Sequence, residues 1–104
     1  MTYILVDGMP VPEPDRLKWA HWFGTQDQTE RIVAKSIVGD EVEVSTVFIG
    51  LDHRFGEPGP PLLWETMIFG GPHDGETWRY SSREQAKDGH LRVIFIAQNL
   101  EVPF

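Results

Sequence analysis

Residues 30–51 read ERIVAKSIVGDEVEVSTVFIGL, and this stretch decides the fold. Residues 30–38 contain a run of Ile and Val and predict a β-strand. Gly39 and Asp40 are turn residues, and residues 41–51, which are rich in Val, Phe and Ile, predict a second strand. Two such runs on either side of a Gly-Asp turn predict an antiparallel hairpin.

Further strand signals lie on both sides of this hairpin. Residues 62–69 predict a third strand after a loop rich in Gly and Pro, and residues 78–80 predict a last, short one. Near the start of the chain, residues 3–6 predict a short strand. Three alternate prolines exclude a helix over residues 9–14, so residues 1–14 are expected to form an extended, Pro-rich N-terminal arm.

Two segments predict helices, and the first lies directly after this arm. Asp15 is a suitable N-cap for a helix through Phe23, which Gly24 is expected to end. This helix has more aromatic surface than two turns can bury on one stripe, because it contains Trp19, Trp22 and Phe23. Part of this surface is therefore expected to remain for a partner or for a second copy of the chain, with packing across the sheet as the alternative.

The second helix is expected to begin at Ser81, because Ser81 and Glu84 have the spacing of a capping box. Residues 91–97 are heavy in β-branched side chains, so a strand is an alternative there, although a helix is favoured. One face of this helix would hold Ala86, His90, Ile94 and Ala97.

The order of these elements predicts an α+β fold. The chain has 104 residues, which fits one domain, and its strands and helices do not alternate as they do around a parallel sheet. We therefore expect a single α+β domain with an antiparallel sheet of about four strands and one or two helices packed on it.

The charge of the chain is concentrated in its middle. Sixteen Asp and Glu against nine Lys and Arg give a net charge of −7, and residues 39–76 hold eight of the acids and one base, Arg54. Such a surface repels phosphate backbones, so direct nucleic-acid binding is not expected, whereas a basic protein surface would be attracted. Simple solubility is the alternative use of these charges. The candidate binding residues are Asp40, Glu41, Glu43, Asp52, Glu57, Asp74 and Glu76, with Trp19 and Trp22 as aromatic anchors.

A second candidate site centres on Glu65. If the strands pair symmetrically across their loop, Glu65 lies opposite Ile49 and Met67 opposite Val47, which places this carboxylate among apolar side chains. A desolvated carboxylate next to a histidine is an environment for acid/base catalysis, and His90 or His53 would be the partner, with Asp52 nearby. A structural ion pair of Glu65 with Arg79, Arg54 or His90 is the alternative.

Several other classes of site lack support in the sequence. The chain has no cysteine, which excludes disulfides and thiolate zinc sites, and its four histidines match no metal-binding spacing, so neither a metal nor a cofactor is predicted. No secretory signal and no apolar run of membrane-spanning length is present, so we expect a protein of the cytoplasm that binds no membrane.

The middle of the chain resembles a family of short hypothetical proteins encoded by phages and prophages. The residues that carry the resemblance are VSTVFIGLDHRFG (44–56), GPPLLWETMIFGGP (59–72), Arg79-Tyr80, Ala86 and Gly89-His90, with Trp19-Ala20-His21-Trp22 as a similar N-terminal tryptophan helix. The resemblance spans most of residues 17–90 and departs after Tyr80, where a more acidic, Trp-containing helix start would be expected. It implies a viral setting, with the cytoplasm of a host cell as the place of action, and it implies no particular reaction.

Three functions follow as hypotheses, the last of which is a structural or assembly role in the virion. The first is a small acidic accessory protein of phage type that binds a host macromolecule with a basic surface, for example a defence protein, and inhibits or modulates it. The second is a small acid/base or metal-dependent enzyme centred on Glu65, His53 and His90.

Overall fold

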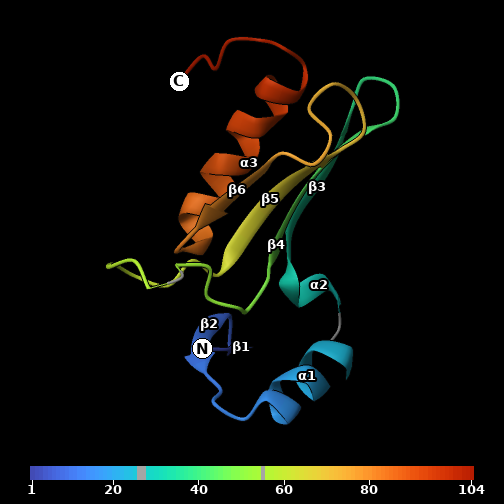
Figure 1. Cartoon of the computed structure of the whole chain (residues 1–104). Coiled ribbons are helices and arrows are strands. Elements are labelled where there is room, and N and C mark those ends of the chain that lie inside the picture. Colours follow the sequence, from blue (N-terminus) through green and yellow to red (C-terminus); the bar gives the residue numbers. More distant parts are fainter. Residues whose placement is uncertain (26–27, 55) are drawn as a thin grey trace.

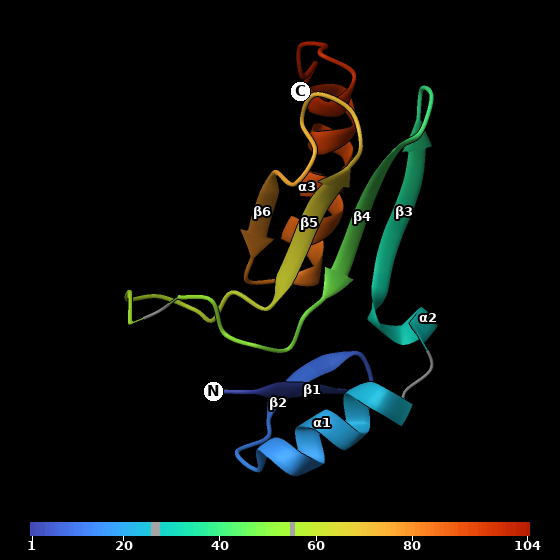
Figure 2. The same ribbon diagram turned by 45° about the vertical axis from the view of Figure 1, so that its right-hand side comes forward.

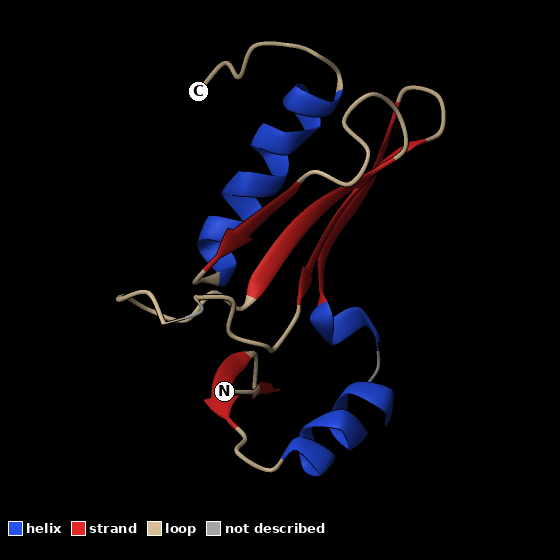
Figure 3. Ribbon diagram, viewed as in Figure 1, coloured by secondary structure: helices blue, strands red, loops and turns tan. Residues whose placement is uncertain are grey.

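The computed structural model describes residues 1–25, 28–54 and 56–104, and it has the α+β architecture expected from the sequence (Figures 1 and 3). Four antiparallel strands form the main sheet in the order β3-β4-β5-β6, and two more form a separate hairpin, β1-β2. The strands are β1 (Tyr3–Val6), β2 (Met9–Pro12), β3 (Ile32–Val38), β4 (Val42–Phe48), β5 (Trp64–Phe69) and β6 (Thr77–Tyr80), and the helices are α1 (Arg16–Thr25), α2 (Gln28–Arg31) and α3 (Arg83–Ala97).

The helix α3 packs across one face of the main sheet, and no described helix covers the opposite face (Figure 1). Side chains that point to α3 form two buried clusters, one at each end of the sheet. The cluster nearer the N-terminal part contains Leu5, Phe48, Leu63, Trp64 and Ala86. The other contains Val38, Val44, Ile68, Val93 and Ala97. We call the uncovered side, which carries every second residue of each strand, the open face.

The register of β4 and β5 differs from the predicted one by two residues. Val47, and not Ile49, lies opposite Glu65, because β4 ends at Phe48 and the backbone N–H of Ile49 donates to the carbonyl of Leu63 outside the ladder. Since the shift is even, each side chain stays on the face predicted for it. Glu65 therefore shares the open face with Val47 and Met67.

The helix α3 is capped one residue later than predicted. Ser82 is the N-cap, and its hydroxyl accepts a hydrogen bond from the backbone N–H of Gln85, whose side chain in turn accepts from Ser81. The capping pair is thus Ser82 with Gln85, and not Ser81 with Glu84. The favoured interpretation of residues 91–97 as helix is confirmed, because α3 continues to Ala97.

The N-terminal part is more ordered than an extended arm. Residues Met9–Pro12 are extended, as their prolines require, but they pair with Tyr3–Val6 as an antiparallel hairpin. The turn of this hairpin is Asp7-Gly8, and both residues have positive φ, 51° and 79°, as a two-residue hairpin turn of the primed type requires.

The helix α1 follows, and its N-cap is confirmed. The Asp15 carboxylate accepts from the backbone N–H groups of Leu17 and Lys18 at 2.9 and 3.3 Å. Gly24 does not end the helix, which runs to Thr25, where the Thr25 hydroxyl donates to the carbonyl of His21. The prediction of strand at residues 30 and 31 was also wrong, because both belong to α2.

Candidate functional site: an acidic tip

Two loops meet at the end of the sheet farthest from α1 (Figure 2). They are the turn between β3 and β4 and the longer loop between β5 and β6. The contact is close: a Cβ atom on Gly70, whose φ is 92°, would lie 2.3 Å from the carbonyl oxygen of Glu41, so glycine is required there. Five carboxylates lie in these two loops or at the start of β4, and we call them the acidic tip: Asp40, Glu41, Glu43, Asp74 and Glu76.

The acidic tip keeps most of its negative charge. Within the described part of the chain, no Lys or Arg forms an ion pair with any of its five carboxylates. The Asp74 side chain accepts from the backbone N–H of Gly70 at 2.6 Å, and Glu76 pairs with His73. Hydrogen bonds to Asn99 and then to Glu76 raise the pKa of His73.

Apolar side chains lie beside these charges on the open face. Ile37 of β3 and Phe69 of β5 are each in direct register with Glu43, which lies between them on β4. Ile37 is 71% exposed and Phe69 is 46% exposed. Exposed apolar side chains next to unpaired carboxylates form the kind of surface that protein partners bind.

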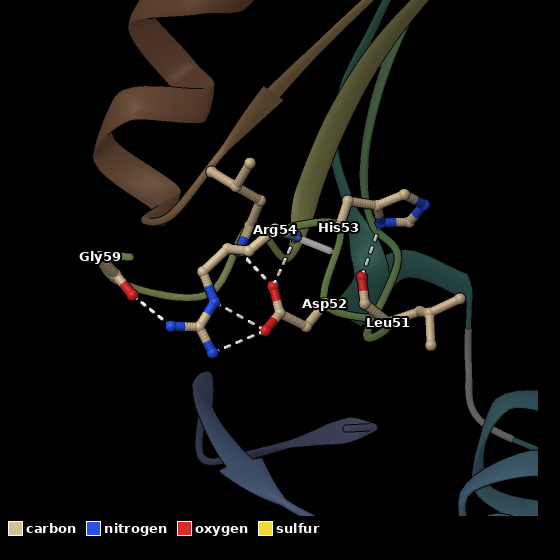
Figure 4. Close-up of polar contacts among 6 residues, drawn as sticks. Leu51, Asp52, His53, Arg54 and Gly59 are labelled. Atoms are coloured by element: carbon tan, nitrogen blue, oxygen red, sulfur yellow. Dashed lines mark hydrogen bonds and ion pairs between the residues drawn. The ribbon is translucent and has the colours of Figure 1, made fainter. Parts of the chain in front are cut away.

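Two of the predicted binding residues do not belong to the acidic tip. Asp52 and Glu57 lie in the loop at the other end of the sheet (Figure 1). There Asp52 holds the loop together: it forms an ion pair with Arg54 at 2.7 Å and accepts from the backbone N–H groups of Arg54 and Leu62 (Figure 4). The hydrogen bond from the Arg54 side chain is the main cause that lowers the pKa of Asp52 to about 2.

The predicted aromatic anchors, Trp19 and Trp22, mainly pack against other aromatic side chains, which was the alternative to partner binding. Trp22 meets Phe48 edge to face, with ring centroids 6.1 Å apart, and Trp19 lies 4.8 Å from the ring of Phe23. These contacts join α1 to the end of the sheet. Leu17, 83% exposed, is the large apolar side chain of α1 that faces solvent.

The structure does not bring the proposed catalytic residues together. Glu65 lies on the open face and forms an ion pair with Arg79 at 3.0 Å, which is one of the structural alternatives. His90 belongs to α3 and contacts the opposite face of the sheet, and His53 lies beyond the end of β4, where its Nδ1 bonds to the carbonyl of Leu51 (Figure 4). An acid/base centre made of these three residues is therefore excluded by the geometry.

A buried polar network was not predicted. His90 is 3% exposed, and its ring nitrogens bond to Ser36 at 2.9 Å and to Thr46 at 2.7 Å. The Thr46 hydroxyl also forms a hydrogen bond with the Thr66 hydroxyl, which accepts a hydrogen bond from the hydroxyl of Tyr80. Ser36 next to a histidine is a nucleophile–base pair in composition, but the His90 ring is almost wholly buried between α3 and the sheet. The network therefore fixes how α3 packs.

Among the described residues, no three His, Asp or Glu side chains are placed to hold a metal ion together. No helix of the described chain has both the length and the apolar character needed to span a bilayer.

Comparison of the chain with protein-family models, with curated proteins and with solved structures gives no significant match.

Proposed function

We propose that this protein is a small accessory protein of phage type that binds a basic surface of a host protein with its acidic tip and thereby inhibits or modulates that protein. The observation that carries the proposal is the convergence of five carboxylates on one end of the sheet without a Lys or Arg paired to them among the described residues. Gly70 permits the close contact between the two loops, and its hydrogen bond to Asp74 orders the loop between β5 and β6.

The physical basis is electrostatic steering followed by apolar contact. A concentrated negative field raises the rate of encounter with a cationic surface, and exposed apolar side chains at the same place supply affinity once the surfaces touch. The acidic tip has both, because Ile37 and Phe69 flank Glu43. Charges placed only for solubility need no such neighbours.

The test is capture of the partner from a lysate of the bacterial host by three forms of the tagged protein. The tip-neutral variant carries Asp40→Asn, Glu41→Gln and Glu43→Gln. The control variant carries the same change in charge at exposed positions elsewhere, Asp7→Asn, Glu57→Gln and Glu84→Gln. We expect the wild type and the control to capture the same basic protein and the tip-neutral variant to lose at least nine-tenths of it.

The captured protein is then purified, and its own activity is measured with each form added. A decrease or change in that activity with the wild type and the control, but not with the tip-neutral variant, supports the proposal. Equal capture by both variants, or a captured protein without a basic surface, would contradict it.

A further inference from the structure

The open face presents three side chains in a straight row beside the acidic tip. Ile37, Glu43 and Phe69 are direct cross-strand neighbours on β3, β4 and β5. Because residues directly opposite each other point to the same side of a sheet, all three project from the open face. The outer two are exposed apolar side chains, and Glu43 forms no ion pair with a described residue.

This row has a defined chemical complement. A carboxylate between two apolar side chains is matched by a cation between two apolar side chains, which places Lys or Arg on Glu43 and apolar groups on Ile37 and Phe69. The next row of the face begins with Lys35, opposite Ser45. Lys35 repels further cations on that side, so the remaining positive charges of a partner would lie toward the acidic tip.

The spacing of the row selects the secondary structure of the partner. Neighbouring strands lie about 4.8 Å apart, so the two outer positions of the row are separated by about 10 Å. Residues i and i+7 of an α-helix are about 10.5 Å apart along the axis, with i+3 and i+4 between them on the same side. In an extended strand, residues i and i+4 lie about 13.5 Å apart. This distance is longer than the row by about the rise of one strand residue.

We infer that the open face beside the acidic tip binds a basic amphipathic helix of the partner protein, with apolar residues at i and i+7 on Ile37 and Phe69 and with Lys or Arg at i+3 or i+4 on Glu43. This inference rests on the proposed function and specifies the part of the partner that the protein recognises. The charged residues of the helix extend from this contact toward Asp40, Glu41 and Asp74.

Two synthetic peptides of identical composition test the inference. Each is an Ala-rich helix of about 20 residues, long enough to be substantially helical. The matched peptide carries Leu at i and i+7 and Lys at i+3 and i+4, and the mismatched peptide carries the same residues with the two Leu on opposite sides of the helix. Binding to the full-length protein is measured by fluorescence anisotropy of the labelled peptides. We expect the matched peptide to bind at least tenfold more tightly.

Variants of the protein locate the contact. Glu43→Gln, Ile37→Ser and Phe69→Ser are each expected to weaken binding of the matched peptide about tenfold. Glu57→Gln and Leu17→Ser make the same chemical changes at exposed positions far from the row and are expected to leave binding unchanged. Circular dichroism of each variant shows whether it is folded, and Glu43→Gln keeps the inference testable if an apolar variant is not.

The outcomes separate this inference from the proposed function. Equal binding of the two peptides, or equal effects of the row variants and their controls, overturns the helix site, while capture of a host protein that depends on the acidic tip still stands. If no host protein depends on the acidic tip, the proposed function itself is wrong.

Discussion

At Gly89, α3 is in close contact with the strand β6 of the sheet. A Cβ atom at this position would lie 2.2 Å from the hydroxyl oxygen of Tyr80 and 2.3 Å from two of its ring carbons. That hydroxyl donates to Thr66 at 2.9 Å, so Tyr80 cannot move aside without breaking the buried network. A glycine in the middle of a helix, which lowers helix stability in isolation, is thus required by the close contact between helix and strand.

The consequence is a measurable loss of stability in Gly89→Ala. Alanine favours the helix by up to about 1 kcal/mol over glycine, but the overlap with Tyr80 outweighs this gain, and we expect the free energy of unfolding to fall by about 1–2 kcal/mol. The matched control is Gly24→Ala in α1, where a Cβ atom would meet nothing within 4 Å and where stability should stay unchanged or rise by about 0.5 kcal/mol. Urea unfolding of both variants measures the difference, and an equal change in the two would contradict the explanation.

Single residues also show where sequence reasoning ends. The excess of carboxylates between residues 39 and 76 is visible in the sequence, but only the contact of Gly70 with Glu41 decides that Asp74 and Glu76 join the acidic tip while Asp52 and Glu57 do not. The alternation of side chains placed Glu65 on the correct face. The alternation could not show that α3 covers the face opposite Glu65, because local periodicity does not determine against which face a distant helix packs.

At the scale of elements, most of the main sheet and both long helices follow from the sequence. Turn residues and β-branched runs predict β3 to β6, and Asp15 predicts the start of α1. The prolines predict only that residues 9–14 are extended, and the pairing partner was not predicted, although Asp7-Gly8 is a common hairpin turn. The helix α2 has only four residues, too few for a periodic pattern to develop.

The contact between α3 and the sheet predicts a dependence of stability on pH. His90 faces Ser36 from β3 and Thr46 from β4, with no charged group among its bonding partners, and burial lowers its pKa. The unfolded chain takes up this proton near pH 6.5, before the folded one does. The contribution of His90 to stability is therefore complete above pH 6.5 and is lost as the pH falls from there toward the lower pKa of the folded state.

We therefore expect the urea midpoint of the wild type to fall between pH 7.5 and pH 5. In His90→Gln, which keeps a side chain able to form hydrogen bonds, this fall should be smaller, whereas in His21→Gln, an exposed position on α1, it should match the wild type. His73 acts in the opposite direction, because its raised pKa stabilises the fold at low pH and this contribution is lost as the pH rises through the folded value. A pH dependence unchanged in His90→Gln would show that His90 does not titrate in this way.

At the scale of the whole molecule, the unpaired carboxylates of the acidic tip lie far from the paired charges of the loop between β4 and β5. The principal extents are 42 × 31 × 22 Å, with the acidic tip at one end of the sheet and the paired Asp52 and Arg54 at the other. A partner with a basic surface is therefore steered toward one end of the molecule.

This separation predicts how salt affects binding of the captured partner. Between about 0.05 M and 0.5 M salt the screening length falls from about 14 Å to about 4 Å, so we expect the association rate to fall at least tenfold while the dissociation rate changes less. Surface plasmon resonance separates the two rates. For the tip-neutral variant, which keeps Asp74 and Glu76, the salt dependence should be clearly smaller, and an undiminished dependence would show that other charges steer the partner.

The two buried clusters have a consequence for biosynthesis. Each contains residues of α3 beside residues that precede them by 22 to 81 positions: Ala86, in the first turn of α3, completes the cluster of Leu5 and Phe48, and Val93 and Ala97, in its last turns, complete that of Val38 and Val44. Neither cluster is complete while its residues of this helix are still inside the ribosome. The nascent chain must therefore stay unfolded, with its apolar strands accessible to chaperones, until that segment emerges.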